Sequence, residues 1–143
     1  TVTNPATLSG AGLTTPVQAA STVNARAAAY LTIGKAVSPA TVAENGTLTY
    51  TFTIQNYGNT AAAETDNVTV SDTFSPILKA ISVTYNGAAW TEGTQYTYNA
   101  ATGAFATTAG QITVPAASLT RDTATGAVVV TPGISTLTVT GTV

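Results

Sequence analysis

Residues 47–54 read TLTYTFTI, and this stretch decides the fold. Every second residue is apolar, and the residues between them are all threonines. Successive side chains of a β-strand point to opposite faces of the sheet, so the stretch predicts a strand with one apolar and one hydroxyl-bearing face. Such a strand belongs to an antiparallel sheet with one face buried and one face in water. Turn-forming residues bracket it, Asn45-Gly46 before and Asn56-Tyr57-Gly58 after.

Four pieces of sequence around this strand resemble one family of surface repeats. They are Lys35 with Ser38-Pro39, Asn45-Gly46, the run from Leu48 to Gly58, and the run from Val68 to Thr73. Their order and spacing are similar to those of the family called domain of unknown function eleven, an immunoglobulin-like module of bacterial and archaeal cell-surface proteins. The resemblance implies a β-sandwich used as a surface building block, and it implies no reaction.

Alternating runs separated by turn residues continue to the end of the chain. Asn86-Gly87 lies between two such runs and is a strong hairpin signal, because both turn residues need positive φ. Further hairpins are expected across 99–103 and 122–126, with a short strand at 111–114 and a last strand at 134–143. Frequent short strands are typical of a sandwich. We therefore predict an all-β fold, an immunoglobulin-like antiparallel β-sandwich with Greek-key connections, over residues 31–143.

Residues 1–30 precede the sandwich and form a predicted N-terminal extension, with an extension strand as a candidate donor. Within residues 17–33 apolar and polar residues alternate with period two, which favours a strand. A single strand of this length is unusual, so two strands in line are expected. A short helix is the alternative, because Thr15-Pro16-Val17-Gln18 could begin one and alanine favours helices.

Few side chains in this chain carry charge or reactive groups. The 143 residues include four basic and six acidic side chains, with no histidine and no cysteine. The usual general base, the commonest transition-metal ligand and all thiol chemistry are therefore missing, and we expect neither an enzyme nor a cofactor. A net charge of −2 provides no electrostatic footprint for nucleic acid. No apolar run approaches the roughly 20 residues that span a bilayer.

Two kinds of ligand or modification site can be weighed from the loops. Glu64, Asp66 and Asp72 could supply oxygen ligands to calcium, but their spacing is not that of an EF-hand loop, and solvated loop acids are the favoured interpretation. Asn45 and Asn67 each begin an Asn-x-Thr glycosylation sequon. Sequons arise often by chance in a threonine-rich chain, so both remain candidates.

One lysine and a group of aromatic residues also invite a functional interpretation. Lys35 could supply the amine of a Lys–Asn isopeptide crosslink, which needs an asparagine on the last strand and a buried acid between them. Residues 134–143 contain no asparagine, so Lys35 is expected to be an exposed charge on an edge strand. Sugar rings could stack on the aromatic residues, but packing in the core is their commoner role in strands. These residues are Tyr85, Trp90, Tyr96 and Tyr98.

The beginning of the chain carries a motif that members of the family have at their end. They often close the sandwich with Thr-Asn-x-Ala-Thr-Val, whereas residues 3–8 here read TNPATL and the last strand lacks the motif. The resemblance therefore implies a sandwich that lacks a strand, which another copy supplies by β-strand addition. Head-to-tail donation does not close and gives a filament. The candidate polymerisation residues are Val2, Asn4, Ala6, Leu8, Leu13, Val17 and Val23.

We predict a structural subunit of an extracellular filament or pilus of a bacterium or archaeon, with copies of itself as its partner. The sequence contains no methionine, so its first residue is expected to follow the removal of a leader peptide. The alternative is a monomeric cell-surface stalk or adhesin module that binds glycan. A filament subunit needs residues 1–30 to be ordered in a neighbour, whereas a stalk module would tolerate their loss.

Overall fold

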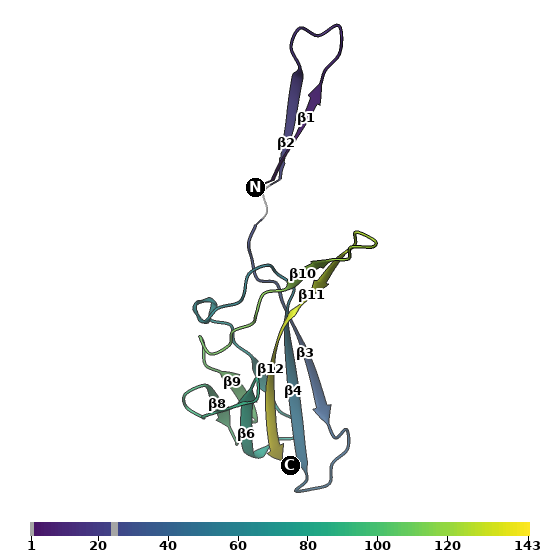
Figure 1. The fold of residues 1–143 in the computed structure, drawn as a ribbon. Helices are drawn as coiled ribbons and strands as arrows, with labels where there is room; N and C mark the ends of the chain where they lie inside the picture. The colour runs from purple at the N-terminus through teal and green to yellow at the C-terminus, as the bar shows by residue number, and fades with distance from the viewer. Residues whose placement is uncertain (1, 24–25) are drawn as a thin grey trace.

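The computed structural model describes residues 2–23 and 26–143, and over these residues it consists of strands, loops and one short 3-10 helix. Two antiparallel sheets pack face to face (Figure 1). The larger has the order β3 (Leu31–Ser38), β4 (Thr47–Asn56), β12 (Gly133–Thr142), β6 (Lys79–Tyr85) and β7 (Ala88–Trp90). The smaller has the order β5 (Ser71–Thr73), β9 (Ala104–Thr107) and β8 (Tyr96–Asn99). The predicted all-β sandwich is confirmed.

Strand β4 behaves as its alternating sequence predicts. Leu48, Tyr50, Phe52 and Ile54 are all buried, and the threonines between them lie on the wetter face. Its neighbour β12 has the same pattern and pairs with β4 along the whole of both strands. Leu137 of β12 lies directly opposite Phe52 and is completely buried. Apolar burial on this shared face supplies most of the stabilisation of the sandwich.

Aromatic rings fill the space between the two sheets. Phe74 follows β5 and stacks on Tyr50, with 4.8 Å between ring centroids. Tyr85 stacks on Trp90 at 4.9 Å. The Tyr98 hydroxyl donates a hydrogen bond to the Leu78 carbonyl at 2.7 Å. The aromatic residues of the strands therefore pack in and around the core, as expected.

Of two strand predictions, the expectation of two strands within residues 17–33 is confirmed, and the strand at residues 111–114 needs correction. The run 17–33 contains two strands, β2 (Val17–Val23) and β3, and residues 24–25 lie outside the described part. Residues 111–114 form no strand and make only one bridge, from Val114 to Ala62. Side chains take the place of a strand partner there. The Thr113 carbonyl accepts hydrogen bonds from the Tyr85 hydroxyl at 2.6 Å and from the Ser135 hydroxyl at 2.9 Å.

Asn56, at the end of β4, fixes the point where the chain enters the sandwich. Its side chain is completely buried, and Oδ1 accepts hydrogen bonds from the backbone N–H groups of Tyr30 at 3.0 Å and Gly58 at 2.9 Å. Its Nδ2 donates to the Thr60 carbonyl at 2.8 Å. A Cβ atom at Gly58 would lie 2.1 Å from the Ala28 carbonyl oxygen, so the two backbones meet only because glycine is present.

We expect Asn56→Ala to lower the free energy of unfolding by about 3 kcal/mol, because it leaves backbone donors and an acceptor without partners. Asn59→Ala is the matched control, since Asn59 Oδ1 accepts only exposed hydrogen bonds, from Ala28 N at 3.0 Å and from Thr60 Oγ1 at 3.4 Å. The control should lose less than about 1 kcal/mol. Urea denaturation measures both values, and equal losses in the two variants would contradict the role given to Asn56.

Candidate functional site

The inner face of strand β3 is left uncovered. Residues that lie directly opposite each other in an antiparallel pair project from the same face, and the register places Ile33 opposite Ile54 and Val37 opposite Tyr50. Ile33 and Val37 therefore face the interior of the sandwich. Yet they are 56% and 45% exposed, whereas Ile54 and Tyr50 are 3% and 7% exposed. Nothing in the described part of the chain buries these two side chains of the inner row of β3.

The cause is the unequal width of the two sheets. The larger sheet has five strands and the smaller has three, so the larger extends beyond its partner. Strand β5 ends the smaller sheet and pairs only with β9 among the described strands. Strand β3 ends the larger sheet on the same side and pairs only with β4 among them. The sandwich is therefore open between β3 and β5, and each of these strands has a free edge.

Two cavities line this opening, and we call them together the β3–β5 groove. The first has a volume of about 170 Å³ and is lined by Leu31, Thr32, Ile33, Ile54, Val68, Thr69 and Val70. The second has a volume of about 480 Å³ and is lined by Lys35, Ala36, Val37, Tyr50, Thr73 and Ser75. The groove thus runs along β3 and offers a largely apolar surface to water.

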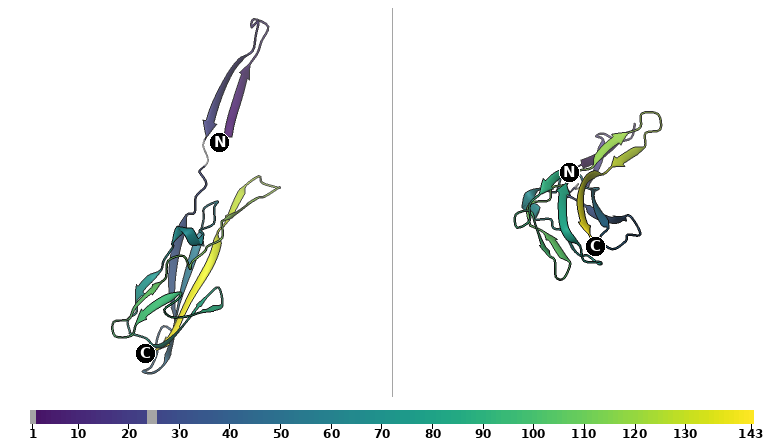
Figure 2. Two further views of the ribbon diagram at one scale, coloured as in Figure 1. Left: turned by 90° about the vertical axis from the view of Figure 1, so that its left-hand side faces the viewer. Right: turned by 90° about the horizontal axis from the view of Figure 1, so that it is seen from below.

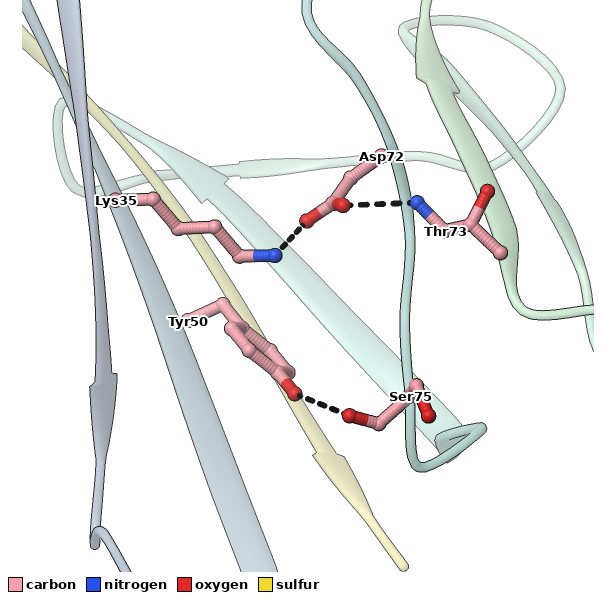
Figure 3. A network of polar contacts seen from close by, with 5 residues as sticks. All are labelled: Lys35, Tyr50, Asp72, Thr73 and Ser75. Carbon is pink, nitrogen blue, oxygen red and sulfur yellow. Dashed lines mark hydrogen bonds and ion pairs between the residues drawn. The ribbon is translucent and has the colours of Figure 1, made fainter.

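A charged pair spans the groove between the two cavities (Figure 3). The Lys35 ammonium contacts Asp72 Oδ2, and Asp72 Oδ1 accepts a hydrogen bond from Thr73 N at 2.8 Å. The lysine nitrogen also lies over the Tyr50 ring, 4.7 Å from its centroid, and near the rings of Phe52 and Phe74. Lys35 is exposed and lies on the edge strand β3, as expected, but its side chain belongs to the inward row of β3 and pairs with Asp72, a partner that was not predicted.

The N-terminal segment forms a hairpin in which β1 (Val2–Leu8) pairs with β2 (Val17–Val23). Figure 1 and the left view of Figure 2 draw it apart from the sandwich. The register gives the hairpin two faces, and the hydroxyls of Thr3 and Thr22 meet at 3.4 Å on one of them. We call the other its apolar face, formed by Asn4, Ala6, Leu8, Val17, Ala19, Ser21 and Val23.

The apolar face of the hairpin is in contact with water. Leu8 is 64% exposed, Val17 56% and Val23 66%, and Leu13 in the turn is also exposed. The polymerisation candidates thus lie on one hairpin, apart from the side chain of Val2, which lies outside the described part. A two-stranded hairpin is marginally stable by itself in water. This hairpin therefore presents a surface that gains stability when another surface covers it.

A second exposed hairpin joins β10 (Ser118–Arg121) to β11 (Val128–Thr131). Asp122 organises its turn, and its Oδ1 accepts hydrogen bonds from Ala124 N at 2.8 Å and Thr125 N at 2.9 Å. These backbone donors, that of Thr125 first, lower the pKa of the Asp122 carboxyl. The turn is therefore held most firmly when Asp122 is ionised.

We expect acid to open this turn before it unfolds the sandwich. The folded carboxyl has a lowered pKa, so its contribution is complete above the titration range of an unfolded aspartate, near about pH 4, and is lost as the pH falls through the folded pKa. Hydrogen exchange of the Ala124 and Thr125 amides measures the opening. Asp122→Asn should remove the pH step, and an unchanged step in that variant would contradict the assignment.

The remaining loop candidates are placed separately. Glu64 and Asp66 belong to the 3-10 helix Glu64–Asp66, and Asp66 Oδ2 accepts a hydrogen bond from Ala63 N at 2.8 Å, while Asp72 pairs with Lys35. Over residues 2–23 and 26–143, no three metal-binding side chains come together. Asn45 and Asn67 occupy exposed turn positions with φ of 61° and 52°. Their glycosylation remains a prediction.

Sequence reasoning missed the groove and the partner of Lys35. The signal was present, because Leu31, Ile33, Lys35 and Val37 alternate with other residues and so share one face of a strand. A lysine within an apolar row indicates an amine that faces the interior. Its partner Asp72 lies on a strand of the other sheet, and only the packing of the two sheets brings them together.

No protein-family model, curated protein or solved structure matches this chain. Nor does the described part of the chain contain a helix that is both long and apolar enough to cross a lipid bilayer. The groove and the hairpin are therefore the features from which a function can be inferred. One lacks a cover, and the other is an exposed strand pair with an apolar face.

Proposed function

We propose that this chain is a structural subunit of an extracellular filament, in which the N-terminal hairpin of one copy adds to the β3–β5 groove of the next copy. The observation that carries the proposal is the uncovered inner row of β3, in a chain that also bears a hairpin with an uncovered apolar face. Both surfaces become buried when they meet. Burial of this kind contributes roughly 25 cal/mol for each Å² of apolar surface removed from water.

The strand count supports this arrangement. The smaller sheet has three strands, and a docked hairpin adds two, which equals the five strands of the larger sheet. Strand β1 pairs with the free edge of β5, so the smaller sheet continues across the opening and covers β3. Free edges of this kind accept an added strand through main-chain hydrogen bonds, and alternate side chains then enter the groove. Asn4, Ala6 and Leu8 of β1 supply these side chains.

The preformed hairpin reduces the cost of assembly. Ordering a flexible donor segment would cost roughly 1–2 kcal/mol for each residue, which would cancel most of the gain from its hydrogen bonds and apolar contacts. Strands β1 and β2 already have extended geometry and paired backbones. Less conformational entropy is then lost on docking, which leaves a larger net gain for association.

Head-to-tail geometry leads from a pair of copies to a fibre. Each copy donates the hairpin at one end and accepts another in its groove, so the two contact surfaces differ. Such an assembly grows as an open filament unless the rotation between successive copies closes it into a ring. A low content of charged side chains, 7%, suits a chain whose surface is largely covered by neighbours. The resemblance to surface repeats supports a location outside the cell.

The alternative function, a monomeric stalk or adhesin module that binds glycan, has less support. It requires aromatic faces open to a sugar ring. Tyr85 and Tyr96 are 8% and 4% exposed, and Trp90 stacks on Tyr85. The aromatic residues named for that function are therefore used in packing.

Electron microscopy and light scattering test the proposal with two variants of the same strand. Leu8→Asp places a charge on the apolar face of the hairpin, whereas Thr7→Asp places it on the opposite face. The unmodified chain and Thr7→Asp should form fibres, and Leu8→Asp should remain monomeric, because burying an unpaired carboxylate is unfavourable. Monomers from the unmodified chain under conditions that favour assembly, or fibres from Leu8→Asp, would overturn the proposal.

A further inference from the structure

The charged pair in the groove has the features of a reactive site. Asp72 Oδ2 is enclosed by protein and has no hydrogen-bond donor among the described residues apart from the contacting Lys35 amine. Aromatic rings lie around that amine, with centroids 4.7 to 5.7 Å from Nζ. The contact places the Asp72 carboxylate where it can take a proton from the Lys35 ammonium. A neutral lysine amine is a nucleophile.

The hairpin carries one carboxamide on its apolar face. Asn4 lies in the middle of β1, in the same row as Ala6 and Leu8, and Gln18 belongs to the opposite face because it pairs with Thr7. A carboxamide that enters an apolar groove needs a polar partner, since an unsatisfied one is costly. The Lys35–Asp72 pair is the charged group in the wall of the groove.

One register of β1 on β5 brings these groups together. Asp72 lies directly opposite the buried Phe105, so its side chain faces the interior. Antiparallel addition of β1 with Asn4 opposite Asp72 places Ala6 opposite Val70 and Leu8 opposite Val68. Val68 and Val70 line the cavity of about 170 Å³, which the Leu8 side chain then enters. Directly opposite residues have Cβ atoms about 5 Å apart, so Asn4 comes within reach of the Lys35 amine.

We propose that Lys35 of one copy forms an isopeptide bond with Asn4 of the copy that docks in its groove, and that Asp72 carries the proton; this rests on the proposed strand addition. Asp72 takes a proton from the Lys35 ammonium, and the neutral Nζ attacks Cγ of Asn4. The Nζ–Cγ bond forms and the bond from Cγ to the carboxamide nitrogen breaks. Lys35 gives up two protons in this step, and the leaving nitrogen takes both of them, one directly and one passed on by Asp72. It therefore leaves as an ammonium ion, and the Asp72 carboxylate is restored.

The arrangement supplies what the reaction needs. The strands hold amine, acid and carboxamide together, which replaces a collision between separate molecules with a step inside one complex. Asp72 acts as general base and then as general acid. The docked strand excludes water from the groove, which favours the amide over hydrolysis. Only Lys35 and Lys79 supply side-chain amines in this chain, so the crosslinked lysine can be identified by substitution.

The test is to heat assembled fibres in detergent, separate the products by electrophoresis, and analyse them by mass spectrometry. The unmodified chain should give a ladder of covalent multimers, and a linked peptide pair containing Lys35 and Asn4 with the loss of one ammonia. Lys35→Arg, Asn4→Ala and Asp72→Asn should each give fibres that dissociate into monomers. Lys79→Arg and Gln18→Ala are the matched controls and should keep the ladder, since neither residue belongs to the proposed triad.

Each other result has a defined meaning. Fibres of the unmodified chain that dissociate into monomers of unchanged mass would overturn the crosslink and leave strand addition standing. The absence of fibres would overturn both. A monomer that is lighter by one ammonia would place the bond within one chain, and a loss of one water would indicate direct condensation of Lys35 with Asp72. Either of these two results would overturn a bond between copies.

Discussion

A copy with a disabled hairpin and a copy with a disabled groove should form a heterodimer and nothing longer. Leu8→Asp blocks donation and leaves the groove intact, whereas Ile33→Asp blocks acceptance and leaves the hairpin intact. Ile33 is 56% exposed, so the aspartate is solvated in the free subunit and becomes costly only when a hairpin covers it. Each variant alone should be monomeric, and an equimolar mixture should contain one functional donor–acceptor contact. Light-scattering mass and analytical ultracentrifugation measure the outcome.

This mixture distinguishes head-to-tail addition from a symmetric contact. In a symmetric dimer both copies use the same surface, so one substitution alters both sides of the contact. Mixing two such variants would then not restore association. Ser38→Asp is the matched control for the groove, because Ser38 neighbours Val37 on β3, projects from the opposite face of the strand, and lines neither cavity. It should polymerise when mixed with the unmodified chain. Fibres from the two blocked variants, or no association at all, would contradict the donor and acceptor roles.

Leu137→Ala should lower the free energy of unfolding by about 4 kcal/mol, because it removes a fully buried side chain and leaves a cavity that the strands cannot close. Leu137 lies at the centre of β12, opposite Phe52 of β4 on one side and Tyr85 of β6 on the other. Both neighbours are held by sheet hydrogen bonds, which limits relaxation into the space. Chemical denaturation of the monomeric Leu8→Asp background measures the loss without interference from assembly.

Thr138→Ala is the control for this prediction. Thr138 is the next residue of the same strand, and its side chain lies on the partly exposed face of the sheet. The same type of truncation there should change the free energy of unfolding by less than about 1 kcal/mol. A small loss for Leu137→Ala would mean that the core repacks around the vacancy, and that β12 is less constrained than its pairing indicates.

The parts of the fold that were predicted from sequence depend on local patterns. Period-two alternation identified β4 and β12, because each has one buried face and one wet face along its whole length. The Asn86-Gly87 turn has φ of 48° and 83°, the positive values that this dipeptide indicates. Each of these features depends on a few residues that are neighbours in the sequence, so the sequence alone identifies it.

The missed parts depend on contacts between distant segments. The Thr113 carbonyl accepts hydrogen bonds from Tyr85 and Ser135, and the sequence around Thr113 indicates neither partner. The pairing of Lys35 with Asp72 requires knowledge of which strands end the two sheets on the same side. The groove itself follows from the numbers of strands in each sheet. The candidate donor residues were identified from a motif, but the hairpin that holds them was not.

The pairing of β3 with β4 also determines how a fibre would respond to tension. The register joins the two strands at eight successive positions, from Leu31 opposite Asn56 to Ser38 opposite Thr49. In a fibre held by docked hairpins, one pull reaches β3 at Leu31 through the chain's own hairpin, and the opposite pull reaches the sandwich through its groove. The hydrogen bonds lie across the strands, so a force along β3 loads them together in shear instead of unzipping them singly. If the proposed fibre forms, we expect pulling on single fibres to meet its main resistance at this strand pair.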